Sequence, residues 1–141
     1  MSKPAMNILL VEDDDVAAEA VIRSLSKNNL NFPVVIAEDG LEALHVLRNE
    51  IPSKKIKKPY LILLDLNMPR MNGFEFLQEI RSDSELKDSI VFVLTTSDAD
   101  SDKSRAYDDN IAGYMVKSAV GPQFLKLAKL LDSYHASVNL P

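Results

Sequence analysis

The stretch that most constrains this chain is the apolar run Tyr60–Leu64, which is followed directly by Asp65. Five consecutive apolar residues between Pro59 and Pro69 predict a strand that is buried on both faces. An ionised aspartate at the end of such a strand is costly unless another group pairs with it. Asp65 is therefore either a cap or turn residue, or part of a ligand site, because open parallel sheets bind ligands at the carboxyl ends of their strands.

Similar apolar runs alternate with segments of helical periodicity along the chain. Strands are expected at residues 7–11, 33–37, 60–64, 90–94 and 112–116, each followed by a helix. This alternation predicts an α/β fold, a doubly wound five-stranded parallel sheet covered by helices on both faces. Right-handed crossovers favour the flavodoxin-like strand order 2-1-3-4-5, with a switch point between strands 1 and 3.

Composition narrows the classes of function. A length of 141 residues suits one domain, expected to occupy residues 1–141 without an output domain. The net charge of −5 argues against nucleic-acid binding, which needs a basic face. The absence of cysteine excludes disulfides, a thiol nucleophile and Cys-ligated zinc. Without a signal peptide or a membrane-length apolar run, we expect no membrane contact and a cytoplasmic location.

Local signals set expectations for the loops and helix ends. Asp14 or Asp15 is expected to cap the first helix. Asp39 and Glu42 have the spacing of a capping box at the start of the second helix. The lysine-rich loop 52–59 is expected to be solvated.

The later helices carry weaker or broader apolar faces. The segment 98–110 is predicted to be a loosely held helix, because Ala106 and Tyr107 are its clear apolar anchors. In the last helix, expected from Phe124 to Tyr134, Leu125 and Leu130 widen the apolar stripe, which we interpret as a broad core face rather than a partner surface.

Polar residues close four of the five expected strands. Glu12 and Asp13 follow the first strand, Asp65 the third, Thr95 the fourth and Lys117 the fifth. Each has an ordinary explanation alone, as a cap, a strand threonine or a solvated lysine. Because the carboxyl ends of parallel strands share one edge of a sheet, their coincidence predicts a single site.

The predicted site has the composition of a phosphoryl-transfer centre. Carboxylates that lie close together raise one another's pKa, and a divalent cation relieves their repulsion. Oxygen ligands without histidine or cysteine suit Mg²⁺ rather than Zn²⁺. Asp65, as the central acid, is the candidate nucleophile, with a lysine and a hydroxyl group available for the phosphoryl oxygens.

These features resemble the response-regulator receiver domain, the family of CheY-like proteins. The resemblance covers essentially the whole chain and rests on the segments Val11–Asp14, Leu64–Gly73, Leu94–Ser97 and Gly113–Lys117. The lysine-rich loop, the Thr95-Thr96-Ser97 sequence and the Lys117-Ser118 pair are most similar to single-domain regulators of the phytochrome-associated type.

The resemblance implies roles for the residues of the site. Asp65 would accept a phosphoryl group from a sensor histidine kinase or a phosphotransfer protein. Asp13, Asp65 and the backbone carbonyl of Asn67 would ligate Mg²⁺, and Glu12 would act through a metal-bound water. Lys117 would contact a phosphoryl oxygen.

The resemblance also implies a switch. Thr95 would donate its hydroxyl to the phosphoryl group, and Tyr114 would be the aromatic residue that turns inward when Thr95 moves. From its position alone, Tyr114 would be a half-buried strand residue with its hydroxyl in water. The expected output surface is the face of the fourth helix, fifth strand and fifth helix, with an unknown protein target and a plausible homodimer.

The sequence departs from the family at three positions of the site. Ser118 replaces the proline that usually follows the lysine, often through a cis bond. A non-proline cis bond costs roughly 2.5–4 kcal/mol, so the sequence leaves this geometry open. Glu12 replaces the commoner aspartate, and its longer side chain still reaches a metal-bound water. Thr96 stands where the family usually has a small residue, which would alter access to the phosphoryl site.

Two other classes of function compete with a phosphoacceptor that signals by binding. An Asp-nucleophile phosphohydrolase of the haloacid dehalogenase type would need a second aspartate two positions after Asp65, where this chain has Asn67. A phosphorylation-independent interaction module would not need the acid, threonine and lysine set. We therefore expect a regulator rather than an enzyme, with slow self-hydrolysis of the aspartyl phosphate at most.

Overall fold

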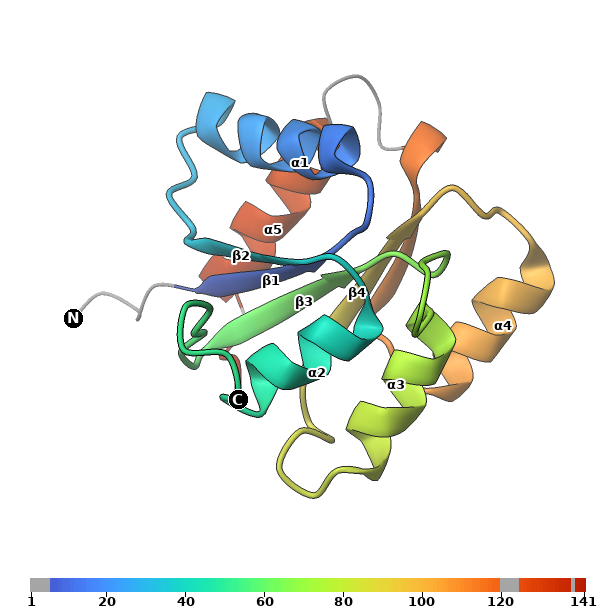
Figure 1. Ribbon diagram of the computed structural model, residues 1–141. Helices are drawn as coiled ribbons and strands as arrows, with labels where there is room; N and C mark the ends of the chain where they lie inside the picture. The colour runs from blue at the N-terminus through green and yellow to red at the C-terminus, as the bar shows by residue number, and fades with distance from the viewer. Residues whose placement is uncertain (1–5, 120–124, 138) are drawn as a thin grey trace.

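A computed structural model describes residues 6–119, 125–137 and 139–141. Its five parallel strands form one sheet in the order β2-β1-β3-β4-β5, which confirms the predicted topology (Figure 1). The strands are β1 Asn7–Val11, β2 Val34–Ala37, β3 Tyr60–Leu64, β4 Ile90–Thr95 and β5 Gly113–Val116.

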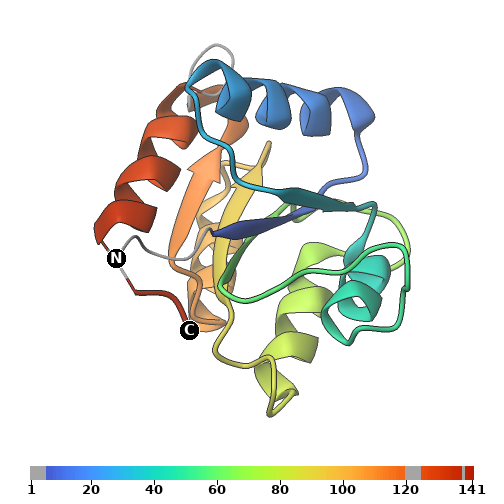
Figure 2. The same ribbon diagram turned by 90° about the vertical axis from the view of Figure 1, so that its left-hand side faces the viewer.

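Five α-helices cover the two faces of the sheet. In Figure 2, α1 and α5 lie on one side of the sheet and α2 and α3 on the other. The helices are α1 Asp15–Lys27, α2 Gly40–Leu47, α3 Gly73–Ser82, α4 Asp100–Asp108 and α5 Leu125–Ser137, with a short 3-10 helix, η1, over Lys117–Ala119. No helix of the described ranges is both long enough and apolar enough to cross a membrane.

The central strand β3 supplies side chains to two separate cores. Leu61 and Leu63 pack with the helices α1 and α5, whereas Ile62 and Leu64 pack with α2 and α3. Every residue of β3 is buried, because side chains alternate between faces and both faces are covered. This double burial is why the run is continuously apolar and why its first polar neighbour, Asp65, is placed at the sheet edge.

Helix capping follows the predicted residues, with one correction. The Asp14 carboxylate caps α1 by accepting from the amide of Val16 at 2.9 Å. Asp39 caps α2 and accepts from the amide of Glu42 at 2.9 Å. The reciprocal half of the expected capping box is replaced, because the Glu42 carboxylate pairs with Lys54 at 2.6 Å instead.

The lysine-rich loop is therefore only partly solvated. Lys54 folds back over the edge strand β2, where its ammonium also donates to the Ile36 carbonyl at 2.9 Å. Its neighbours Lys55, Lys57 and Lys58 are exposed as expected. A complete capping box occurs at α3, where Asn72 and Glu75 satisfy each other's amides.

Two expected core residues lie at the surface. In α4, Ala106 is buried but Tyr107 is 51% exposed, so only one of the two predicted apolar anchors packs into the core. In α5, Leu130 is 36% exposed and does not widen the core face, which corrects the sequence interpretation. Phe124 and the side chain of Leu125 lie outside what the structure describes.

Gly73, the first residue of α3, packs directly against the segment that carries Asp65. A Cβ atom at this position would lie 2.7 Å from both the Asp65 carbonyl oxygen and the Leu66 Cα. We expect Gly73→Ala to lower the free energy of unfolding by about 1–3 kcal/mol, because backbone atoms must shift to relieve the overlap. Urea unfolding measures this, with exposed Gln78→Ala on the same helix as the control; an unchanged midpoint for Gly73→Ala would contradict the packing.

Candidate functional site

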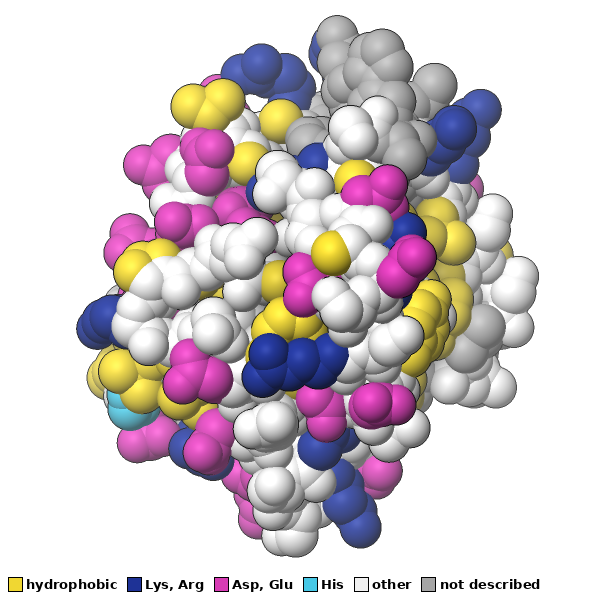
Figure 3. Space-filling view, turned by 90° about the vertical axis from the view of Figure 1, so that its right-hand side faces the viewer, with side chains coloured by type: hydrophobic (Ala, Val, Ile, Leu, Met, Phe, Trp, Pro, Cys, Tyr) yellow, Lys and Arg dark blue, Asp and Glu magenta, His cyan; other side chains and the backbone are white. Residues whose placement is uncertain are grey.

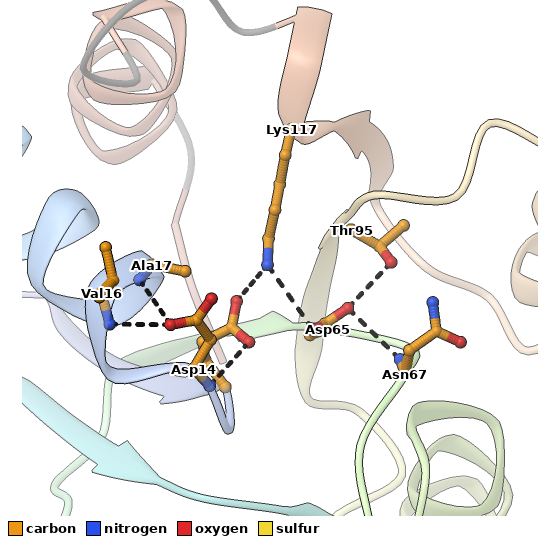
Figure 4. Close-up of polar contacts among 8 residues, drawn as sticks. Asp14, Val16, Ala17, Asp65, Asn67, Thr95 and Lys117 are labelled. Atoms are coloured by element: carbon orange, nitrogen blue, oxygen red, sulfur yellow. Dashed lines mark hydrogen bonds and ion pairs between the residues drawn. The ribbon is translucent and has the colours of Figure 1, made fainter.

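The carboxyl ends of the strands bring the predicted polar residues together. In the parallel register Val11 pairs with Leu64, Leu64 with Val93, and Thr95 with Val116, so the strands end nearly level. Figure 4 shows Thr95 and Lys117 pointing toward Asp65 from the ends of β4 and β5. The structure thus brings to one edge the residues that the sequence predicted there.

Asp65 is a buried carboxylate with three partners. Its side chain accepts a hydrogen bond from the hydroxyl of Thr95 at 2.9 Å and from the amide of Asn67 at 3.3 Å. The Lys117 ammonium lies 3.6 Å from its second oxygen. Asp65 is 7% exposed and Thr95 is fully buried, so these contacts supply the compensation that a desolvated carboxylate needs.

Lys117 is shared between two carboxylates. Its ammonium forms its shorter contact with Glu12 and a longer one with Asp65. Burial raises the pKa of Glu12 to about 7, with a further contribution from the nearby Asp65 charge, although the Lys117 hydrogen bond opposes the shift. Burial would lower the pKa of Lys117, but pairing with Glu12 and Asp65 outweighs it and raises that pKa.

The carboxylates of Glu12, Asp13 and Asp65 fit a hard divalent cation. One oxygen from each lies within 4.8 Å of the others, and Asp13 is exposed at the mouth of the cluster. These three acids face one lysine, so the site retains an excess of negative charge. Oxygen donors in this number suit Mg²⁺ or a similar ion. An open groove beside them is lined by residues that include Asn67 and Phe74.

Tyr114 lies outside this polar cluster. Its hydroxyl donates to the backbone carbonyl of Ser97 at 2.9 Å rather than to water, and burial raises its pKa. Ser97 in turn donates its hydroxyl to Asp102 at 2.6 Å. Sequence reasoning did not find this connection, because the hydroxyl partner of a strand tyrosine depends on loop geometry.

The turn that carries Lys117 lacks the cis peptide bond that often follows this lysine in the family. Lys117 and Ser118 begin η1. Within the described part of the chain, Lys58–Pro59 is the cis peptide bond, and Lys117–Ser118 is trans. The lysine nevertheless reaches both carboxylates.

Comparison with known proteins identifies the family. The model of the "Response regulator receiver domain" matches residues 8–129. The chain belongs to the response-regulator receiver family. This agrees with the strand order and with the placement of the acidic, hydroxyl and lysine side chains at one edge of the sheet.

Individual relatives are similar over nearly the full length of this receiver protein. Response regulator Rcp1 of Synechocystis sp. is 34% identical, and the alignment covers 99% of this chain and 96% of Rcp1. The phosphorylated cyanobacterial phytochrome response regulator RcpA has a TM-score of 0.85 at 36% identity, with 98% and 99% of the two chains covered. The Mn²⁺-bound form of Rcp1 has a TM-score of 0.83 at 34% identity, also with 98% and 99% of the two chains covered. These likenesses do not favour the phosphohydrolase alternative.

The raised pKa of Glu12 predicts how the stability of the metal-free receiver depends on pH. Between about pH 4.5 and 7 the folded protein binds more protons than the unfolded chain, so the free energy of unfolding falls as pH rises. We expect Glu12→Gln to remove roughly 2 to 3 kcal/mol of this fall. Urea unfolding in EDTA at pH 5 and pH 8 measures it, with exposed Glu19→Gln as the control. Equal pH dependence in wild type and Glu12→Gln would contradict the assignment.

Proposed function

We propose that this response regulator acts as a stand-alone phosphoacceptor, in which Asp65 receives a phosphoryl group from a phosphohistidine. The observation that carries the proposal is the convergence of the Thr95 hydroxyl and the Lys117 ammonium on the buried Asp65 carboxylate. The alignment with Rcp1, which spans 96% of that protein, supports a single domain over residues 1–141.

The transfer makes one bond and breaks another. An Asp65 carboxylate oxygen forms a bond to phosphorus as the nitrogen–phosphorus bond of the donor breaks, and the electron pair of that bond returns to the imidazole. Lys117 and Thr95, which both contact Asp65, would neutralise and hydrogen-bond the phosphoryl oxygens. Lys117 must loosen its contact with Glu12 to follow the phosphoryl group.

We assign the cation site to Asp13, Asp65 and the backbone carbonyl of Asn67, with Glu12 acting through water. Mg²⁺ is the expected ion, because it uses few carboxylates and retains waters. When bound, it supplies positive charge for the phosphoryl oxygens. The Mn²⁺-bound form of Rcp1 supports a divalent ion in this class of receiver.

The output is proposed to reach the face made by α4, β5 and α5 through Thr95 and Tyr114. Ser97 follows Thr95 by two residues and holds the Tyr114 hydroxyl, so a shift of Thr95 toward a phosphoryl group would pull on this hydrogen bond. A groove on this face is lined by residues that include Tyr107, Met115 and Leu130. In Figure 3, hydrophobic side chains form a strip to the right of the centre of the view, with acidic and basic side chains beside it.

The phosphodonor is proposed to be a sensor histidine kinase or a phosphotransfer protein. RcpA is a phytochrome response regulator, which supports a photoreceptor kinase as one source. The homodimer and the cytoplasmic location expected from the sequence stay predictions. Loss of the phosphoryl group by slow self-hydrolysis would limit the signal without metabolic turnover.

Phosphorylation by a small donor tests the acceptor. With acetyl phosphate and Mg²⁺, intact-mass spectrometry should show one added phosphoryl group on the wild type and none on Asp65→Asn, because the amide is not nucleophilic. Asp88→Asn is the matched control, since this exposed aspartate precedes β4 at the opposite edge. Modification of Asp65→Asn to the wild-type extent would exclude Asp65 as the acceptor.

Metal binding tests the acidic cluster. Asp13→Asn should weaken Mn²⁺ binding about tenfold or more, because it removes one of the charged oxygens of the site. Titration followed by electron paramagnetic resonance of free Mn²⁺ measures the dissociation constant. Asp15→Asn, an exposed neighbour in the first turn of α1, is expected to bind as wild type does. A similar loss in both variants would indicate only a general charge effect.

A further inference from the structure

The loop that carries Asn67, residues 66–72 and here termed the acceptor loop, is fixed at its α3 end by backbone contacts. The amide of Gly73 donates to the carbonyl of Leu66 at 3.0 Å, which closes the loop on itself. Gly73 also lies against Asp65 with no room for a Cβ atom. The base of the acceptor loop is therefore attached directly to the phosphoacceptor.

The tip of the acceptor loop is held from a different element, the start of α2. The Arg70 Nε atom donates to the Asp39 carboxylate at 2.5 Å. The amide of Gly40 donates to the Met71 carbonyl at 3.0 Å. A Cβ atom on Gly40 would lie 2.8 Å from that carbonyl oxygen, so the close approach requires glycine. Two adjacent residues of the loop thus contact the N-cap and the first residue of α2.

The Asp39–Arg70 pair differs from an ordinary surface ion pair. The Asp39 side chain is 4% exposed, whereas that of Arg70 is 59% exposed. Burial would raise the pKa of Asp39, but hydrogen bonds from the Glu42 amide and from Arg70 outweigh it and lower that pKa. One carboxylate oxygen caps α2 and the other accepts from Arg70. Because the acid is desolvated and fixed by the helix, it is a rigid anchor for the guanidinium.

The backbone of Arg70 indicates that this contact is maintained at a cost. Its φ angle is 61°, in the left-handed region that is uncommon for a residue with a Cβ atom. Such conformations persist only where the surrounding contacts impose them. The side chain of Arg70 reaches Asp39 from this conformation, and Asn67 lies three residues earlier on the same short loop.

We propose that Arg70 and Asp39 are positioning residues, which hold the acceptor loop so that the Asn67 carbonyl is aligned with Asp13 and Asp65 for a divalent cation. This inference rests on the proposed function of those three residues. The Asn67 amide already donates to the Asp65 carboxylate at 3.3 Å, so the loop is preorganised before a cation arrives. Fixing the loop from α2 reduces the ordering needed on binding.

The test separates the ion pair from the helix cap and from the backbone conformation. Arg70→Ala removes the guanidinium. Asp39→Asn removes the charge but keeps an oxygen for the cap, since asparagine is also a good N-cap. Arg70→Gly removes the side chain and relieves the left-handed conformation. Arg48→Ala is the control, because Arg48 pairs with Glu79 and Asp83 in exposed contacts elsewhere.

Two readouts are needed, one with the cation and one without it. The Mn²⁺ dissociation constant should rise about three- to tenfold in Arg70→Ala, Arg70→Gly and Asp39→Asn. The double variant Arg70→Ala/Asp39→Asn should be no weaker than either single variant, because both remove one interaction. In the metal-free protein, amide hydrogen exchange should become faster across residues 66–72 and stay unchanged in β3. Arg48→Ala should alter neither.

Several results would overturn the inference. Wild-type affinity in Arg70→Ala, full affinity in Arg70→Gly, or additive losses in the double variant would each show that the ion pair does not position the loop. Unchanged exchange in the acceptor loop would do the same without any metal. Failure of the wild type itself to bind Mn²⁺ would instead overturn the proposed cation site, and this inference with it.

Discussion

The structure depends on one electrostatic requirement, the compensation of the Asp65 carboxylate at the end of a strand that is buried on both faces. Desolvation makes an unpaired charge there expensive. Three different segments supply the compensating contacts, through the Thr95 hydroxyl, the Lys117 ammonium and the amide of Asn67. Because each partner comes from a strand end or from the loop after β3, the parallel topology itself assembles the site.

The positive charge at the site does not balance its carboxylates, which suits the binding of a cation. Lys117 divides its charge between Asp65 and Glu12, while Asp13 adds a further carboxylate at the mouth. Burial is the main reason that the pKa of Glu12 is raised, and the nearby Asp65 charge adds to the shift. A cation and a phosphoryl group together would rearrange these contacts, since the lysine cannot serve both carboxylates and a new anion equally. The same groups that make Asp65 tolerable in the fold are thus the ones that phosphorylation would disturb.

The sequence predicted what periodicity and strand ends determine, and missed what depends on side-chain direction. The strand order and the gathering of polar residues follow from five apolar runs and a parallel sheet. Glu42 was expected to complete a capping box, but a lysine distant in sequence competes for it. Leu130 fits the apolar stripe of α5 yet faces outward. The contact between Arg70 and Asp39 could not be predicted from the sequence, because capping α2 already accounted for Asp39.

The uneven anchoring of the helices explains why a change at Asp65 would be felt on one side. Gly73 packs α3 against Asp65 and Leu66, and Arg70 connects the acceptor loop to the start of α2. The side of the site that faces α2 and α3 therefore has little freedom to move. By contrast, α4 begins after Ala99, whose methyl side chain cannot accept a capping hydrogen bond. Its one buried residue is Ala106. A displacement of Thr95 therefore meets least resistance in the segment that follows β4. We therefore expect the direction of such a response to follow the weaker packing, because the strong contacts resist the same force.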